Sequence, residues 1–338
     1  MKNIPEADQI KKIVDSSKRI LILQADNPDG DSLGSALALE SILGEIGIET
    51  TLYCAVKIPD YLRYIDGWDR VQTDIPSNFD ASIIVDVSTD SLFDSLNKTP
   101  EKNLIAKKPS IIIDHHFVDK TIGRVDVVCV QEAVATAEVI YELSKQLDWP
   151  LSNNALKPLL AAILADSLGL TSEGTSARSI EIVAEIVKNG VTIAEIEYAR
   201  RELAKKTPAL LHYKGELLQR VEYFDDDRIS IVSIPWIEIE KYSHDYNPSV
   251  LVLDDMRQTN GVAIVIAFKI YKDGKVTAKI RCNHGYGIAD KLAKHFGGGG
   301  HAFASGFKIT NGKTLEAIKS DTIKITSELL NEVDDNLK

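Results

Sequence analysis

Acidic and histidine side chains follow three apolar stretches in the first half of the sequence. Asp29 and Asp31 lie in a short turn after the first stretch, Asp86 follows the second, and Asp114-His115-His116 follows the third. Carboxylates that gather at one place repel one another and are costly to bury unless a positive charge lies among them. Carboxylate and imidazole ligands without a thiolate are typical of divalent ions such as Mn(II) or Mg(II). The pattern therefore predicts a divalent metal centre.

The stretches that precede these residues have the composition of buried strands. Residues 19–23, 81–87 and 110–113 are nearly continuous apolar runs, which is typical of parallel strands buried on both faces. Helical spacing of apolar residues follows at 32–46, 133–147, 153–168 and 176–188. This alternation predicts an α/β domain with a mostly parallel sheet and flanking helices. In such a sheet ligands bind beyond the carboxyl ends of the strands, where all three acidic groups would meet.

The pattern changes near residue 190. Residues 192–220 read as helical and are expected to bridge two domains. Strand patterns follow at 229–234, 261–271 and 276–281, with a hairpin turn at 272–274, and a last strand is expected near 303–309. Helices are expected at 288–295 and from 314 to about 331. We therefore expect a first domain at 1–188, a helical linker at 189–225 and a smaller α+β domain at 226–335.

The composition limits the class of protein. The chain has 338 residues, of which 44% are hydrophobic and 26% charged, as in a soluble globular protein of two domains. We expect no membrane span and no signal peptide, since the first residues are polar and no apolar run is long enough. Three scattered cysteines without a CxxC pair indicate a reduced, cytoplasmic protein. The net charge of −11 argues against tight, sequence-independent binding of long nucleic acid.

Each acidic fragment also fits an ordinary structural role when it is taken alone. Asp29-Gly30-Asp31 is typical of a turn and a helix N-cap, and Asp86 fits an exposed loop residue. A single histidine is more often structural than a ligand. Asp114-His115-His116 directly after an isoleucine strand fits such a role less well, and the whole set together favours a functional site.

The motifs resemble those of the DHH phosphoesterases. Residues 27–35 are similar to the first motif of that family, Asp86 stands at the aspartate of the second, and Asp114-His115-His116 is the signature that names the family. Residues 165–169, which include Asp166, resemble the fourth motif, and the segments 297–301 and 304–306 resemble the Gly-Gly-Gly-His motif of the DHH-associated domain. The resemblance covers nearly the whole chain in the right order. It is closest to the nanoRNases, the pAp phosphatases and related cyclic-dinucleotide phosphodiesterases.

The resemblance implies roles for the acidic residues. Asp31, Asp86, His115 and Asp166 would hold one metal ion, and Asp29 would help to hold a second ion that Asp86 shares. Two such ions, expected to be Mn(II), activate water and polarise a phosphate. Of the remaining motif residues, the aspartate at 114 would orient a histidine and His116 would lie near the scissile phosphate as a proton donor or charge stabiliser.

Four consecutive glycines, Gly297, Gly298, Gly299 and Gly300, precede His301. Such a tract lets backbone N–H groups face an anion, and His301 and Arg281 can add charge-assisted hydrogen bonds. A flexible hairpin loop is the alternative, but phosphate binding is favoured because a histidine follows directly and a strand resumes. The resemblance implies that this domain holds the non-scissile end of a short oligonucleotide, a linear dinucleotide such as pApA, or 3′-phosphoadenosine 5′-phosphate.

One position departs from the family pattern. Ala25 stands where the first motif usually has a histidine, so the second metal site is expected to be weakened. Two other functions therefore stay open: a nucleotide-binding protein with weakened catalysis, and a pyrophosphatase or exopolyphosphatase. The glycine tract favours the nucleotide substrate. Family members of this size often form homodimers, although one sequence shows no interface.

Overall fold

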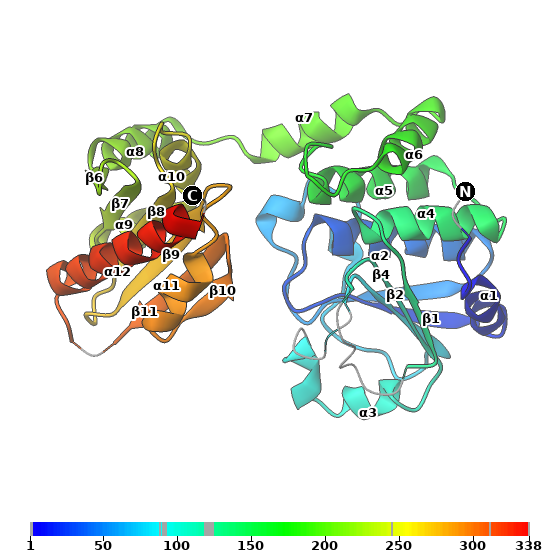
Figure 1. The fold of residues 1–338 in the computed structure, drawn as a ribbon. Helices are drawn as coiled ribbons and strands as arrows, with labels where there is room; N and C mark the ends of the chain where they lie inside the picture. Colours follow the sequence, from blue (N-terminus) through cyan, green and yellow to red (C-terminus); the bar gives the residue numbers. More distant parts are fainter. Residues whose placement is uncertain are drawn as a thin grey trace. The chain divides into compact units, whose positions relative to one another are not determined.

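The computed structural model of the protein describes residues 3–87, 89, 93–117, 125–244, 246–310 and 312–336 (Figure 1). It forms two compact units, Met1–Lys205 and Lys206–Lys338. The boundary between them falls inside the segment 189–225 that was expected to be a helical linker. No helix in the described part of the chain is long and apolar enough to cross a membrane.

The first unit contains a five-stranded sheet of order β2-β1-β3-β4-β5, in which all neighbours are parallel. Its strands are β1 (Arg19–Leu23), β2 (Glu49–Tyr53), β3 (Ala81–Val85), β4 (Ser110–Asp114) and β5 (Val127–Val130). The three strands predicted from the sequence are the central ones. The edge strands β2 and β5 were not predicted, because both are partly exposed, β2 begins with three polar residues and β5 has only four residues. The parallel α/β class is confirmed.

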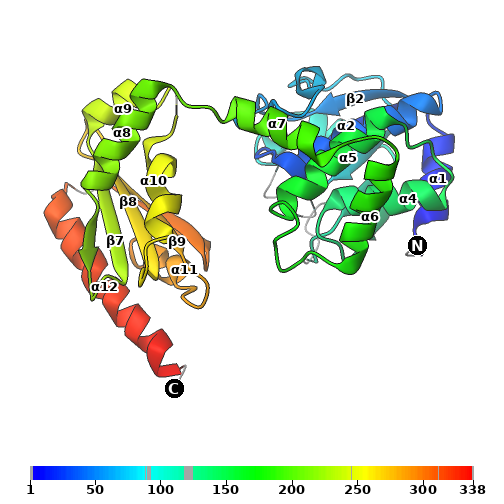
Figure 2. The same cartoon turned by 90° about the horizontal axis from the view of Figure 1, so that it is seen from above.

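Helices cover this sheet on both faces (Figures 1 and 2). On one face of the sheet, Ile20 and Ile22 of β1 pack with helices α1, α2, α4, α5 and α6. On the other face, Leu21 and Leu23 pack with residues of α3. Burial on both faces explains the continuous apolar runs. The helices are α1 (Ala7–Asp15), α2 (Gly30–Glu45), α3 (Glu101–Ile105), α4 (Thr136–Gln146), α5 (Asn153–Asp166), α6 (Ala177–Lys188) and α7 (Ile193–Leu203), with short 3-10 turns at Asp60–Leu62, Trp68–Arg70 and Leu96–Lys98.

Helices α2 and α5 pack unusually closely, which brings the first and fourth motifs together. A Cβ atom on Gly34 would lie 2.5 Å from the Pro158 carbonyl oxygen and 2.8 Å from the Ala162 Cβ, and one on Gly30 would lie 2.4 Å from the Ala165 Cβ. Only glycine permits this approach. The start of α2 and the end of α5 therefore lie side by side at the edge of the sheet.

The second unit is built on a six-stranded mixed sheet of order β10-β11-β9-β8-β7-β6, in which β7 and β8 are parallel and the other neighbours antiparallel. Its strands are β6 (Glu222–Phe224), β7 (Ile229–Ile234), β8 (Ile264–Ile270), β9 (Val276–Cys282), β10 (Gly299–His301) and β11 (Ala304–Ile309). Its helices are α8 (Pro208–Gln219), α9 (Trp236–Tyr242), α10 (Pro248–Arg257), α11 (Ala289–His295) and α12 (Leu315–Asn336). Helices α8 to α10 pack on one face of the sheet, and α11 and α12 pack on the other.

The long bridging helix predicted at 192–220 is two helices, α7 and α8, which belong to different units. Helix α8 begins anew because Thr207 caps it, accepting a hydrogen bond from the Leu210 amide at 3.2 Å, and Pro208 occupies its first turn. Proline in the first turn is compatible with a helix start but would break a continuous helix. The strand expected from Gly261 begins only at Ile264, and α9, α10, β6 and β10 were not predicted.

Candidate metal centre

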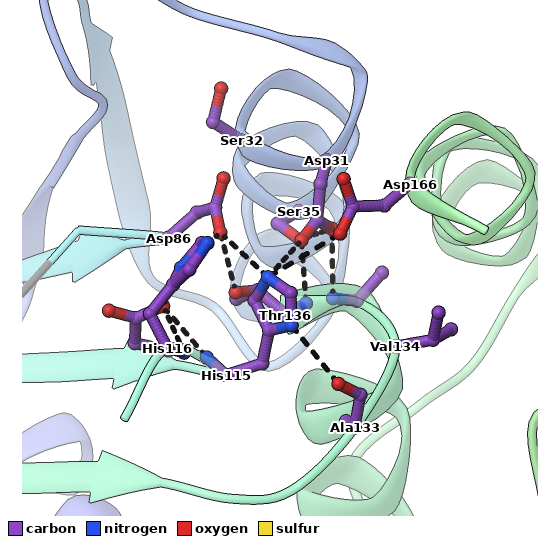
Figure 3. A network of polar contacts seen from close by, with 12 residues as sticks. Asp31, Ser32, Ser35, Asp86, His115, His116, Ala133, Val134, Thr136 and Asp166 are labelled. Carbon is purple, nitrogen blue, oxygen red and sulfur yellow. Dashed lines mark hydrogen bonds and ion pairs between the residues drawn. The ribbon is translucent and has the colours of Figure 1, made fainter. Parts of the chain in front are cut away.

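The carboxyl ends of β1, β3 and β4 lie beside the start of α2, the start of α4 and the end of α5. Asp86 follows β3 directly, Asp114 is the last residue of β4, and His115 and His116 follow it. Asp31 lies in the first turn of α2, and Asp166 is the last residue of α5. Figure 3 shows the side chains of Asp31, Asp86, His115, His116 and Asp166 close to one another. The structure thus brings together residues that are up to 135 positions apart in the sequence, from Asp31 to Asp166.

Asp31 is held rigidly and is almost fully buried, with 1% of its surface exposed. Its Oδ2 atom accepts a 2.6 Å hydrogen bond from the Thr136 amide, and Oδ1 accepts from the Ala137 amide and the Ser35 hydroxyl, both at 3.1 Å. The two amides belong to the start of α4, where the helix dipole favours a negative charge. Burial, together with the charges of Asp166 and Asp29, nevertheless raises the pKa of Asp31 to about 7.

His115 offers a free nitrogen to the centre of this cluster. Its Nδ1 atom lies 3.1 Å from the Ala133 carbonyl oxygen, which can only accept, so Nδ1 carries the proton and Nε2 of the neutral ring is bare. Nε2 is buried without a hydrogen-bond partner. It lies 3.9 Å from Asp31 Oδ2, 3.6 Å from Asp86 Oδ1 and 3.5 Å from Asp166 Oδ2. These distances exceed a hydrogen bond and suit four ligands around one divalent ion.

Asp86 takes a backbone conformation that is uncommon for a residue other than glycine, with φ of 60°. Aspartate tolerates this region better than most residues, and such strain is concentrated at functional sites. Its Oδ1 atom accepts a 3.0 Å hydrogen bond from the Thr136 hydroxyl, which fixes the carboxylate beside His115. Burial and then the charges of Asp31, Asp29 and Asp114 raise its pKa well above the ordinary value. A cation among these carboxylates would remove that cost.

Asp166 lies at the C-terminal end of a helix, where the helix dipole disfavours a negative charge. Burial raises its pKa, an effect that His115 partly offsets. The placement is unfavourable for the fold alone and favourable for a cation ligand. Within the described residues, potential ligand atoms closer than 4.8 Å to one another form two groups, Asp31-His115-Asp166 and Asp86-Asp114-His115-His116.

Asp114 orients the histidines. It is fully buried, and its Oδ1 atom accepts hydrogen bonds from the His115 amide at 2.7 Å, the His116 amide at 3.1 Å and His116 Nδ1 at 2.9 Å. The bond from Nδ1 raises the pKa of His116, whose side chain is half exposed. Asp114 thus shapes the turn and keeps the His116 ring positively charged to higher pH.

Asp29 and the segment before it lie beside the cluster. The Asp29 Oδ1 atom caps α2 by accepting from the Ser32 amide at 2.9 Å, and Asp29 is in neither of the two groups of ligand atoms within the described residues. Ala25 is buried in the apolar core on the α3 side of the sheet. The adjacent Gln24 is fully buried, and both polar atoms of its amide are without a partner. Asp26 accepts from the Ser95 amide at 2.7 Å.

The glycine tract lies in the second unit, and its last two glycines begin a strand that the sequence did not predict. Residues 299–301 form β10, an exposed edge strand paired with β11. A Cβ on Gly298 would lie 2.2 Å from the Gly306 carbonyl oxygen, and one on Gly300 would lie 2.6 Å from the Ala304 carbonyl oxygen. The hairpin itself therefore requires these two glycines, whereas Gly299 borders open space. Register places His301 opposite Ala304, which pairs in turn with Arg281.

The sequence did not predict the residues that orient the cluster through hydrogen bonds. Thr136 contributes its amide to Asp31 and its hydroxyl to Asp86, and Ala133 fixes the tautomer of His115. Glu138, which is buried, accepts from the Val134 amide at 3.3 Å and so orders the same loop. The sequence signal was a threonine and a glutamate two residues apart at the start of a helix pattern. Such a pair is common at helix starts in general, so it did not point to this cluster.

Two family models match the sequence. The DHH family, N-terminal domain model matches residues 19–163, which include Asp29, Asp31, Asp86 and the Asp114-His115-His116 signature. The DHHA1 domain model matches residues 239–328, which include the glycine tract.

Similar proteins include the bifunctional oligoribonuclease and PAP phosphatase NrnA of Thermus thermophilus, 25% identical over 281 residues that cover 83% of this chain and 81% of that protein. The protein of the same name from Bacillus subtilis is 21% identical over 307 residues, covering 89% of this chain and 92% of its own. The crystal structure of an exopolyphosphatase-related protein from Bacteroides fragilis shares the fold, with a TM-score of 0.83 at 19% identity, and covers 98% of this chain and 99% of that one. The chain therefore carries the N-terminal domain of the DHH family in its first unit and a DHHA1 domain in its second.

Proposed function

We propose that this chain is a metal-dependent phosphoesterase that acts on short oligonucleotides, linear dinucleotides such as pApA, or 3′-phosphoadenosine 5′-phosphate. The observation that carries the proposal is the bare Nε2 atom of His115, buried without a partner and within 3.5–3.9 Å of three carboxylates. Relatives named as oligoribonucleases and PAP phosphatases support the choice of substrates.

Four residues would hold the first ion: Asp31, Asp86, His115 and Asp166. Two of the three carboxylates are buried and all three have raised pKa values, so a divalent cation would relieve their mutual repulsion. Oxygen and imidazole donors without a thiolate favour Mn(II) or Mg(II), and we propose Mn(II). When bound, such an ion supplies Lewis-acid polarisation of a phosphate and lowers the pKa of water.

A second ion would bind beside the first, between Asp29 and Asp86. The capping bond uses Oδ1 of Asp29 and leaves Oδ2 for an ion. Ala25 has no ligand atom to add, which weakens this second site. Asp26, which is already bonded to the Ser95 amide, is not a free substitute.

His116 is the residue of this chain that would transfer a proton or stabilise charge at the substrate. Its Nδ1 atom is bonded to Asp114, and this bond raises the pKa of the ring, so the positive charge persists to higher pH. Half exposure of the side chain leaves it accessible to a phosphate. Asp114 acts through His116 and does not touch the substrate, because its Oδ1 atom is occupied by three donors.

In the second unit, we propose that Arg281, His301 and the backbone of the glycine tract bind a substrate phosphate. Arg281, Ala304 and His301 follow one another in a row across β9, β11 and β10. In the tract Gly297, Gly298, Gly299 and Gly300, the first two amides already donate to the Lys294 and Ala293 carbonyl oxygens at 3.0 and 2.8 Å. An anion would therefore approach the exposed edge strand in which the tract ends.

A nucleotide-binding protein with weakened catalysis is the second candidate. Ala25 favours it, because the position lies in an apolar core and offers no ligand. The two candidates differ in the number of tightly bound ions. Two ions per chain by titration calorimetry favour the enzyme, and one ion favours the binding protein.

The test is release of mononucleotide from pApA in the presence of Mn(II), followed by chromatography. We expect release by the natural chain and loss of release in the double variant His115→Ala, Asp86→Ala. A double variant with exposed residues of the same types, His212→Ala and Asp8→Ala, should behave like the natural chain. Equal release by all three proteins would indicate a contaminating nuclease.

If the natural chain is silent, the variant Ala25→His decides between the candidates. Activity that appears only in Ala25→His would refute the active-enzyme proposal and leave a binding protein. If both are silent toward pApA, inorganic pyrophosphate and 3′-phosphoadenosine 5′-phosphate are tested next, and hydrolysis of pyrophosphate alone would point to a pyrophosphatase.

A further inference from the structure

One face of the sheet in the second unit carries a row of cations that the site described above does not use. In an antiparallel sheet, residues directly opposite one another share a face. Lys269 on β8 is opposite Thr277 on β9, which is opposite Lys308 on β11. The neighbouring row on the same face runs from Ala267 through Lys279 to Gly306 and Gly299, and the next row contains Arg281 and His301.

Every titratable side chain in these three rows is cationic or a histidine. They are Lys269, Lys279, Lys308, Arg281 and His301, and their neighbours in the rows are Ala267, Thr277, Gly299, Ala304, Gly306 and the buried Val265. In the part of the chain that the structure describes, none of the three lysines and not Arg281 forms an ion pair with a carboxylate. Carboxylates elsewhere in this unit do pair with lysines, as Asp255 does with Lys214 at 2.7 Å. The rows are thus a concentration of unbalanced positive charge on a chain of net charge −11.

Two of the lysines, Lys269 and Lys279, are partly buried beside other cations. Burial lowers the pKa of Lys269, and the neighbouring charge of Lys279 lowers it further. Burial and then Arg281 lower the pKa of Lys279 in the same way. Like charges side by side on a sheet destabilise it unless an anion binds between them.

Helices cover one side of this face, and small side chains cover the other. Helices α8, α9 and α10 cover this face over β7 and β8, and α10 reaches β9. Toward β11 and β10 the rows contain Gly306, Ala304 and Gly299, whose small side chains keep the sheet backbone accessible. Successive rows are about 7 Å apart, since each strand residue advances 3.3–3.4 Å. A flexible, extended chain of phosphates fits such a ladder, because single-strand binding uses a cationic groove that follows the backbone.

We infer that the lysine ladder of Lys269, Lys279 and Lys308 binds the phosphodiester backbone of a single-stranded oligonucleotide that extends past the phosphate held by Arg281 and His301. This inference rests on the proposed function and adds a length preference to it. Substrates of three to five nucleotides gain contacts that a dinucleotide or a mononucleotide lacks. The ladder is short, and the acidic remainder of the chain repels a longer polyanion.

Binding of a 5′-phosphorylated, 3′-fluorescent pentaribonucleotide tests the ladder without requiring catalysis. Anisotropy is measured in EDTA at several salt concentrations for the natural chain and for the double variant Lys279→Ala, Lys308→Ala. Each lost phosphate contact lowers the slope of log K against log salt by about 0.7 on a single strand, so two lost contacts lower it by about 1.4. Between about 50 and 200 mM salt, the affinity advantage of the natural chain should therefore shrink by about sevenfold, which is 4 raised to 1.4.

A matched control removes the same charge from the other side of the sheet. Lys291 on α11 and Lys324 on α12 are exposed, and both helices pack on the opposite face. The double variant Lys291→Ala, Lys324→Ala should keep the natural slope and affinity. If Lys279→Ala impairs folding, as judged by circular dichroism, the single change Lys308→Glu at an exposed position carries the same test.

Catalysis separates a failure of the ladder from a failure of the proposed function. With Mn(II), the ladder variant should hydrolyse bis(p-nitrophenyl) phosphate like the natural chain and show a raised KM for the pentanucleotide only. A natural chain that hydrolyses nothing refutes the proposed function, while the anisotropy result still stands. The inference is overturned if the natural chain and the ladder variant show equal salt slopes, or if the control variant loses as much affinity as the ladder variant. It is also overturned if the natural chain binds phosphatidylserine vesicles and not the oligonucleotide.

Discussion

Replacing Asp31 by asparagine should make the metal-free protein less sensitive to pH. The Asp31 carboxylate is buried against the start of α4, and burial, with Asp166 and Asp29, raises its pKa from 3.8 to about 7. Asparagine carries no charge and keeps nearly the same shape. The charge at this position also raises the pKa of Asp86, so its removal relieves a second carboxylate.

The sign and size follow from proton linkage. Below pH 3.8 Asp31 is protonated in both the folded and the unfolded chain, so its contribution to stability is complete there. Between pH 3.8 and 7 the unfolded chain releases the proton and the folded chain keeps it, so stability falls as pH rises. From pH 5 to pH 7 this amounts to about 3 kcal/mol, at about 1.4 kcal/mol for each of two pH units, and above pH 7 the loss stays constant. The variant lacks this loss.

Urea denaturation in EDTA at pH 5 and pH 8 measures the effect. We compare the change in unfolding free energy between the two pH values, because hydrogen bonds that asparagine cannot replace cancel in that difference. The variant Asp80→Asn is the control: backbone amides of Lys18 and Arg19 lower the pKa of this exposed carboxylate, which therefore titrates below the window. Addition of Mn(II) at pH 8 should stabilise the natural chain and not Asp31→Asn. Parallel pH profiles for the two proteins would refute the reasoning.

Three further results are expected. Gly34→Ala should lower the unfolding free energy by about 1–3 kcal/mol, because its Cβ would meet the backbone of α5, whereas Gly44→Ala on the same helix meets no atom within 4 Å and should raise it by about 0.5–1 kcal/mol; both are read from urea denaturation. Glu138→Ala should weaken Mn(II) binding about 10–100-fold in calorimetry with an unchanged circular dichroism spectrum, since Glu138 orders the loop that fixes the tautomer of His115, the proposed ligand; unchanged affinity would contradict this role. Asp114→Asn should lower the pKa of His116 in an NMR titration, because an uncharged amide oxygen stabilises the protonated ring less than the carboxylate does, and an unshifted titration would show that Asp114 does not set it.

The sequence determined the two domain families, the fold class and which residues meet in the first unit. The central strands β1, β3 and β4 were predictable because burial on both faces leaves continuous apolar runs, and parallel strands deliver their carboxyl ends to one edge. The strand ends were therefore expected to bring Asp31, Asp86 and His115 together, and the resemblance to the DHH motifs added Asp166. All four lie in one cluster. Their roles as metal ligands stay a prediction.

Strands and helices that are only partly buried, or that depend on contacts distant in sequence, could not be predicted. The edge strands β2 and β5 have mixed exposure, and their pairing comes from the sheet beside them. The division of residues 192–220 into α7 and α8 depends on packing against two different cores, into which Ile196 and Leu210 are buried. The Thr207 cap and Pro208 mark the break locally, and contacts distant in sequence decided to which unit each helix belongs.

Only the tertiary structure decided the tautomer of His115, the hydrogen bonds from the start of α4 to Asp31 and the cationic rows on the second sheet. Each depends on groups far apart in the chain: Asp31 is 105 residues from Thr136, and the ladder joins three strands through their register. A sequence states which side chains exist, and hydrophobic periodicity orders them along an element. Hydrogen bonds and charge interactions act over a few ångströms, so they are fixed only when folding places their partners within reach.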